Sequence, residues 1–174
     1  ADFQNGLTNA GKIQLSEGVS FSKDSANTTL LISGGTLVNE ATGVIESVIG
    51  DGSGTIGSRT ISGTIDNQGL IEAVDQDLIL TGATLTDSGE LKTNTDTSII
   101  VSTGSRFNPG TGQITGAGTF ELRGGAELGD GTIIGDVEFY DARVPLGTSV
   151  TNTGVLTFHQ HFSSSSSADV TRTI

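Results

Sequence analysis

The sequence predicts an all-β fold: a single-stranded parallel β-helix, or β-solenoid, that is right-handed and built from coils of about 20–26 residues. Three observations predict it. Apolar residues come in short runs bounded by glycine and small polar residues. A motif of the form apolar–x–Asn/Asp–x–Gly–x–apolar recurs along the chain. The steps between its copies suit one coil, which needs two or three short strands and the turns between them.

The short apolar runs justify the strands. Examples are Leu30–Ile32, Leu78–Leu80 and Ile99–Val101, in which every side chain is branched. Gly, Asn, Asp, Ser or Thr interrupts the chain every few residues, which is typical of short buried strands and leaves no helical periodicity. No apolar run reaches the roughly 18 residues that a membrane-spanning helix requires, so we expect a protein that is not embedded in a membrane.

The recurring motif justifies the coils. Its glycines are Gly11, Gly43, Gly69, Gly89, Gly112 and Gly154, separated by 32, 26, 20, 23 and 42 residues, the last gap being two steps of 21. The aliphatic residue two positions after each glycine is expected to point inward and to stack on its equivalents about 4.8 Å away. This predicted column is Ile13, Ile45, Ile71, Leu91, Ile114 and Leu156. The Asn or Asp, which every copy except the degenerate one at Gly112 contains, is expected at a corner, where it accepts left-handed backbone and hydrogen-bonds its own main chain.

A second repeated block leads into the first. Leu30–Leu37 aligns without gaps on Leu78–Leu85, 48 residues later, which indicates two coils of 24. The repeats predict one β-solenoid domain over residues 1–162, followed by a Ser-rich linker and short tail over residues 163–174. We expect this tail to add a strand to the sheet of a neighbouring copy.

Composition excludes several function classes. The chain has 174 residues, a net charge of -12 and no cysteine. A strongly acidic chain is a poor ligand for nucleic acid, which is held mainly by Lys and Arg. Without cysteine there is no disulfide framework, thiol nucleophile or Cys-ligated metal site.

Three short motifs are weak candidates for ligand binding. Gly52–Gly57 matches a dinucleotide fingerprint, but the β-branched residues that follow do not predict the helix that the fingerprint needs. Asp51 with this stretch, and Gly129–Gly131, resemble single fragments of calcium-binding nonapeptide repeats, which act only in tandem. His159 and His161 lie two apart on a predicted strand, opposite Phe158 and Phe162, with no third metal ligand nearby in sequence.

Two polar patterns bear on binding to carbohydrate or to ice. Glu46 and Glu72 are expected at the same position of adjacent coils, with Lys92 in the third, which is typical of a solvated charge ladder as well as of a paired-carboxylate site. Sugar-binding grooves usually expose aromatic rings, and the chain has no Trp and one Tyr, Tyr140. The alternating threonines of Thr93–Thr97 occur in one copy only. We therefore assign no catalytic, cofactor-binding or metal-binding residue, and expect no cofactor.

The repeated Asn-x-Gly-x-aliphatic units, with Gly-Gly or Thr-Gly before the next Leu, resemble those of bacterial surface β-helices, namely filamentous-haemagglutinin-type adhesins and autotransporter passenger domains. The resemblance extends over most of Leu7–Phe162 and implies an exported β-solenoid. The loops at Asp51–Arg59 and Arg143–Ser149 depart from the pattern, so a localised function is expected there.

The sequence thus predicts a non-enzymatic structural or adhesive module of a bacterial surface protein or a self-assembling filament, located outside the cell or on its surface. Its expected partners are copies of itself stacked end to end, or the rest of a longer parent chain, because a solenoid exposes strand edges at both ends. A host-surface or polysaccharide ligand is a further expectation. The alternative is a carbohydrate-binding or carbohydrate-cleaving β-helix.

Overall fold

The computed structural model describes residues 1–16, 27–50, 57–82 and 84–159, and in these ranges the chain is all-β, without a helix. The strands form a twelve-stranded, a five-stranded and a two-stranded sheet, in which all neighbouring described strands are parallel. The predictions of an all-β chain and of parallel strands are confirmed. No helix long and apolar enough to cross a membrane occurs among the described residues.

The twelve-stranded sheet consists of β1 (Asp2–Phe3), β2 (Leu7–Asn9), β4 (Thr28–Asn39), β6 (Arg59–Asn67), β8 (Leu78–Thr81), β9 (Thr84–Asp87), β11 (Ser98–Val101), β12 (Arg106–Pro109), β14 (Thr119–Arg123), β15 (Glu127–Leu128), β17 (Val137–Tyr140) and β19 (Leu156–His159). The five-stranded sheet consists of β3 (Lys12–Leu15), β5 (Val44–Ser47), β7 (Leu70–Ala73), β10 (Glu90–Thr93) and β13 (Gln113–Gly116). The two-stranded sheet pairs β16 (Gly131–Ile133) with β18 (Val150–Asn152).

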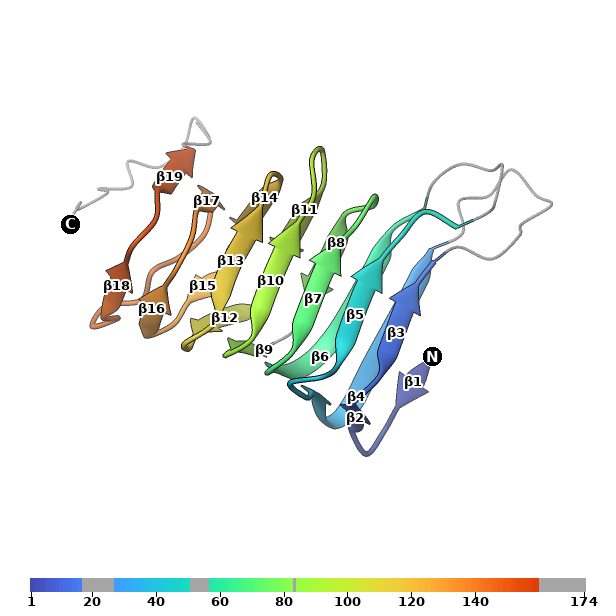
Figure 1. Ribbon diagram of the computed structural model, residues 1–174. Helices are drawn as coiled ribbons and strands as arrows, with labels where there is room; N and C mark the ends of the chain where they lie inside the picture. The colour runs from blue at the N-terminus through green and yellow to red at the C-terminus, as the bar shows by residue number, and fades with distance from the viewer. Residues whose placement is uncertain (17–26, 51–56, 83, 160–174) are drawn as a thin grey trace.

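The strands follow one another along the molecule in chain order. In the five-stranded sheet β3, β5, β7, β10 and β13 lie side by side in that sequence (Figure 1). The larger sheet contains the path β1–β4–β6–β8–β11–β14–β17–β19, with β1 and β19 at opposite ends (Figure 1). Residues far apart in sequence therefore become neighbours one strand apart.

The predicted aliphatic column is present in the five-stranded sheet. Ile13 pairs with Ile45, Ile45 with Ile71, Ile71 with Leu91, and Leu91 with Ile114. The three inner members are fully buried, whereas Ile13 and Ile114 at the two edges are partly exposed. Five of the six predicted members are thus confirmed in their predicted register.

The sixth member, Leu156, was predicted wrongly. It lies in β19 of the larger sheet, where it pairs with Val137. The step between register partners is not constant: it shortens from 32 residues between Ile13 and Ile45 to 17 between Glu121 and Glu138. Because the last steps are short, the residue two after the final motif glycine falls into the larger sheet.

The gapless alignment of the second repeat is also wrong in its first half. Leu30 pairs with Ile61, which pairs with Leu80, so Leu30 is equivalent to Leu80 and not to Leu78. The register of β4 against β6 shifts between Leu31 and Thr36, where β4 contains extra residues. A β-bulge of this kind is invisible to an alignment without gaps.

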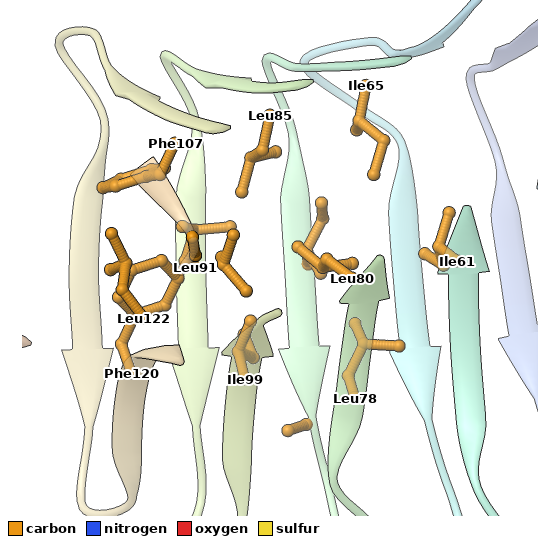
Figure 2. Packing of buried hydrophobic residues seen from close by; sticks show 14 of the residues in the cluster. Ile61, Ile65, Leu78, Leu80, Leu85, Leu91, Ile99, Phe107, Phe120 and Leu122 are labelled. Carbon is orange, nitrogen blue, oxygen red and sulfur yellow. The ribbon is translucent and has the colours of Figure 1, made fainter. Parts of the chain in front are cut away.

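The core lies between the two larger sheets. Leu91 of the five-stranded sheet and Leu85, Ile99 and Leu122 of the twelve-stranded sheet all have no exposed surface, and Figure 2 shows their side chains in the shared interior. Phe107 and Phe120 pack with ring centroids 4.9 Å apart. Burying an aliphatic side chain contributes about 1.5–3 kcal/mol, so this stack provides the main stabilisation of the fold.

A buried ladder of amide side chains runs beside the core. Asn9 donates to Asn39 (2.8 Å), Asn39 to Asn67 (2.7 Å) and Asn67 to Asp87 (2.7 Å), each from Nδ2 to Oδ1. Each asparagine also donates to a backbone carbonyl of the five-stranded sheet, as Asn39 does to Leu70 of β7 (3.1 Å). These are the Asn and Asp residues of the motif. They bond along the sheet stack, in addition to the local bond that Asn9 Oδ1 accepts from a backbone N–H two residues on (3.2 Å).

Candidate functional site

The shared position predicted for Glu46, Glu72 and Lys92 is confirmed, and the three residues form one register row of the five-stranded sheet. Glu46 pairs in register with Glu72, and Glu72 with Lys92. Each carboxylate is engaged by an ammonium group: Lys12 Nζ lies 2.7 Å from Glu46 Oε2, and Lys92 Nζ lies 2.7 Å from Glu72 Oε1. The hydrogen bond and charge of Glu72 raise the pKa of Lys92. Both carboxylates of the predicted pair are thus engaged in ion pairs with lysines.

The predicted histidine strand is described only up to His159; His161 and Phe162 lie outside the described residues. The alternation is confirmed for Phe158, which stacks on Phe139 at 4.7 Å, and for His159 on the other face, which stacks on Tyr140 at 4.1 Å. His159 Nε2 lies 3.0 Å from Glu138 Oε2. No group of three or more His, Asp or Glu side chains able to hold a metal ion exists within the described ranges.

Tyr140 is not an open platform for a sugar ring. His159 covers one face, and the Arg123 guanidinium lies 4.8 Å from the ring centroid; both residues are register neighbours on opposite sides of Tyr140. The Tyr140 hydroxyl donates to Glu138 Oε2 (2.6 Å), and this hydrogen bond raises the pKa of Tyr140.

The remaining motifs form no ligand site in the described residues. Residues 51–56 of the dinucleotide-like stretch lie outside them, and the segment that follows forms β6, not a helix. Asp130 accepts the backbone N–H of Ser149 (2.7 Å), so this aspartate holds a loop in place. Thr93 and Thr97 are buried, and Thr97 Oγ1 donates to the carbonyl of Ala73 (2.8 Å), so the alternating threonines do not present a flat polar face.

Of the loop Asp51–Arg59, where a localised function is expected, the described part ends in a buried arginine. Arg59 has no exposed surface; its Nε donates to the Val48 carbonyl (3.1 Å) and its Nη1 to the Gly57 carbonyl (2.9 Å). The guanidinium therefore joins the two ends of the segment that includes residues 51–56.

A polar groove of about 370 Å³ crosses the outer face where β9, β12 and β15 begin. Its register row is Thr84, Arg106, Glu127 and Arg143, one residue from each of four neighbouring segments. The row faces outward because the residues that follow Thr84, Arg106 and Glu127 are buried in the core. We call this feature the arginine groove.

Two turns complete the arginine groove, at 103–105 and at 124–125. Gly104, Gly124 and Gly125 have positive φ angles of 73°, 57° and 80°. A Cβ atom at Gly124 would lie 2.7 Å from Thr103 Oγ1, so a side chain there would fill part of the groove. Sequence reasoning named the Arg143 loop but missed the groove, because Arg106, Glu127 and Arg143 become neighbours only once the register is known.

The two ends of the larger sheet are the other notable surface. In the described chain β1 pairs only with β4 and β19 only with β17, so each has a free edge. The four most exposed large apolar side chains among the described residues are Val144 and Leu146, in the loop between β17 and β18, and Val155 and Phe158, at or next to β19; they are exposed by 51%, 106%, 60% and 54%. Apolar exposure is thus concentrated in the C-terminal part of the described chain.

Comparisons of the chain with protein-family models, with curated proteins and with solved structures found no match.

Proposed function

We propose that the chain is a β-solenoid module with a structural or adhesive role in a bacterial surface protein or extracellular filament, and that it is not an enzyme. The parallel register supports the solenoid, because equivalent residues of successive chain segments stack in the same order over the described strands. The resemblance of the motif to adhesin and autotransporter passenger repeats supports the extracellular setting.

The observation that carries the proposal is the path from β1 to β19, which forms one sheet whose two end strands each pair on one side only among the described residues. Seven strand spacings of about 4.8 Å separate the two edges, which gives a rod of roughly 34 Å. Stacked aliphatic columns and the asparagine ladder make such a rod stiff. End strands that pair on one side only within the described ranges can accept a further coil of the same chain or of a second copy.

The geometry of β19 identifies the groups available for that contact. Val137 N–H donates to the Val155 carbonyl (2.9 Å). In a parallel ladder alternate N–H groups face one neighbour, so the N–H groups of Leu156 and Phe158 face away from β17. Together with the exposed Phe158 ring they form the end surface that the proposal requires.

Electron microscopy and multi-angle light scattering of the purified chain test the proposal. End-to-end contact predicts rods or larger species that become monomeric particles when Phe158 is replaced by Lys, because the lysine puts a charge on the apolar face where Phe158 stacks on Phe139 and where the next coil would pack. Thr157→Lys is the matched control, since Thr157 lies on the same strand with its side chain on the opposite face. Globular particles without an elongated axis would contradict the proposal.

We propose that the chain is not a glycosidase because Glu46 and Glu72 are both engaged in ion pairs with lysines. A reducing-sugar screen on neutral and acidic polysaccharides is expected to show no turnover. Turnover that is lost in Glu46→Gln or Glu72→Gln would favour the carbohydrate-cleaving alternative.

A further inference from the structure

We propose that the arginine groove binds the carboxylate group of an acidic saccharide. This inference names a ligand site for the adhesive role proposed above and relies on that role only for the choice of ligand; the charge and shape of the groove are independent of it.

The groove is a positively charged place on an acidic protein. Arg106 and Arg143 face one acidic lining residue, Glu127, which gives the lining a net charge of +1 on a chain of net charge -12. Because the rest of the surface repels anions, a groove with surplus positive charge is where an anionic ligand would bind most favourably.

Among the described residues, Arg106 makes one loose ion pair and Arg143 makes none. Arg106 Nε donates to Asn108 Oδ1 (2.9 Å), and Nη1 lies 3.6 Å from Glu127 Oε2, an ion pair longer than a hydrogen bond. The Arg143 side chain makes no hydrogen bond or ion pair with the described residues, although its backbone pairs with Ala126 and Leu128. Donors of both arginines are thus available to a ligand.

Arginine favours a carboxylate among small polar groups. Its planar fork offers two parallel N–H donors that match the two oxygens of a carboxylate. Arg106 pairs with Glu127 and Glu127 with Arg143, so the backbones of the two arginines lie two strand spacings, or about 10 Å, apart. Side chains of this length reach a common carboxylate from both sides of the row.

The rest of the lining indicates a hydrophilic ligand. All nine lining residues are Thr, Ser, Gly, Arg or Glu, and none is aliphatic or aromatic. A lipid or an apolar peptide anchor would find no partner there. The exposed Thr103 and half-buried Thr84 hydroxyls can bond sugar hydroxyls, and about 370 Å³ is within the usual size of small-ligand sites, roughly 300–1,000 Å³.

Isothermal titration calorimetry with tetragalacturonate at low ionic strength tests the site. We expect saturable binding by the unaltered chain and a loss of at least about tenfold in affinity in Arg143→Gln and in Arg106→Gln. Gly124→Asn is expected to weaken binding without changing charge, because Asn tolerates a positive φ and its side chain occupies the groove. Lys92→Gln, which removes a surface cation from the other sheet, is the matched control and should bind within about twofold of the unaltered chain.

Two further ligands separate the contributions. The fully methyl-esterified tetramer lacks the charge and should not bind, and sodium acetate carries the charge without the sugar and should bind far more weakly. No saturable binding of tetragalacturonate, or unchanged affinity in Arg143→Gln, would overturn the site. Equal affinity for the esterified tetramer would overturn the role of the carboxylate, and equal affinity for acetate would overturn the saccharide assignment. None of these results depends on the end-to-end contact tested above.

Discussion

The asparagine ladder makes a quantitative prediction at Asn39. This residue has no exposed surface, donates from Nδ2 to Asn67 Oδ1 (2.7 Å) and the Leu70 carbonyl (3.1 Å), and accepts from Asn9 Nδ2 (2.8 Å). Asn39→Ala removes these three bonds. At about 1 kcal/mol for each bond, the variant should lose about 3 kcal/mol of folding free energy, with more lost if the orphaned groups stay dry.

A loss of this size is measurable because whole domains are stable by only about 5–15 kcal/mol. Urea unfolding followed by far-ultraviolet circular dichroism should show the midpoint falling by roughly 1–3 M at an unchanged slope. Gln68→Ala is the control: Gln68 also makes a side-chain hydrogen bond, to Asp66 (2.9 Å), but it is exposed. If Asn39→Ala unfolds at the same urea concentration as Gln68→Ala, the ladder does not stabilise the fold as argued.

Three other substitutions test the account. Burial raises the pKa of Asp87 from 3.8 to about 6, so between these pH values the folded state holds a proton that the unfolded state has lost. The stability of the fold should therefore fall by up to about 3 kcal/mol as the pH rises from about 4 to 6. In thermal melts Asp87→Asn should remove this part of the decline, and a pH profile identical to that of the unaltered chain would refute the prediction. Phe107→Ala, at a ring that is 1% exposed, should cost about 3–5 kcal/mol in urea unfolding, and a cost below about 1 kcal/mol would contradict the packing. Gly116→Ala should unfold the chain or greatly lower its melting temperature, because φ is +105° and a Cβ would lie 1.7 Å from the Thr93 carbonyl oxygen. Gly11→Ala is the control: its Cβ meets no atom within 4 Å, so this variant should melt like the unaltered chain.

The motif predicted the register within the five-stranded sheet because each copy contains residues that identify the equivalent position. The glycine and the aliphatic residue after it have fixed spacing, so Ile45, Ile71 and Leu91 could be superposed without knowing the chain between them. Leu156 failed because the same local pattern is used where the step has shortened and the strand joins the other sheet. The local sequence determines whether a side chain points into the core, while the number of residues between two strands determines which strand lies beside it.

Contacts between side chains of neighbouring strands were harder to predict from the sequence. The corner role of Asn39 was predicted, but its lateral bonds to Asn9 and Asn67 depend on register across steps of 30 and 28 residues. The arginine groove is a similar case, since Arg106 and Glu127 are neighbours only through the pairing of β12 with β15. The bulge in β4 had no signal beyond its adjacent glycines.

A rod of parallel coils in one register, as proposed, fixes the distance between residues of the same row along the stack. Thr29 and Thr157 are exposed and occupy the same row of the twelve-stranded sheet, six strand spacings apart. The chain has no cysteine, so nitroxide labels on Thr29→Cys and Thr157→Cys are unambiguous in double electron–electron resonance. The predicted distance between the two backbones is about 29 Å, to which the side chains of the labels add their own length, and its distribution should be narrow. Labelling Thr60→Cys in place of Thr29→Cys should shorten the measured distance by about 5 Å. A centre below about 20 Å, or no shortening, would contradict a parallel stack.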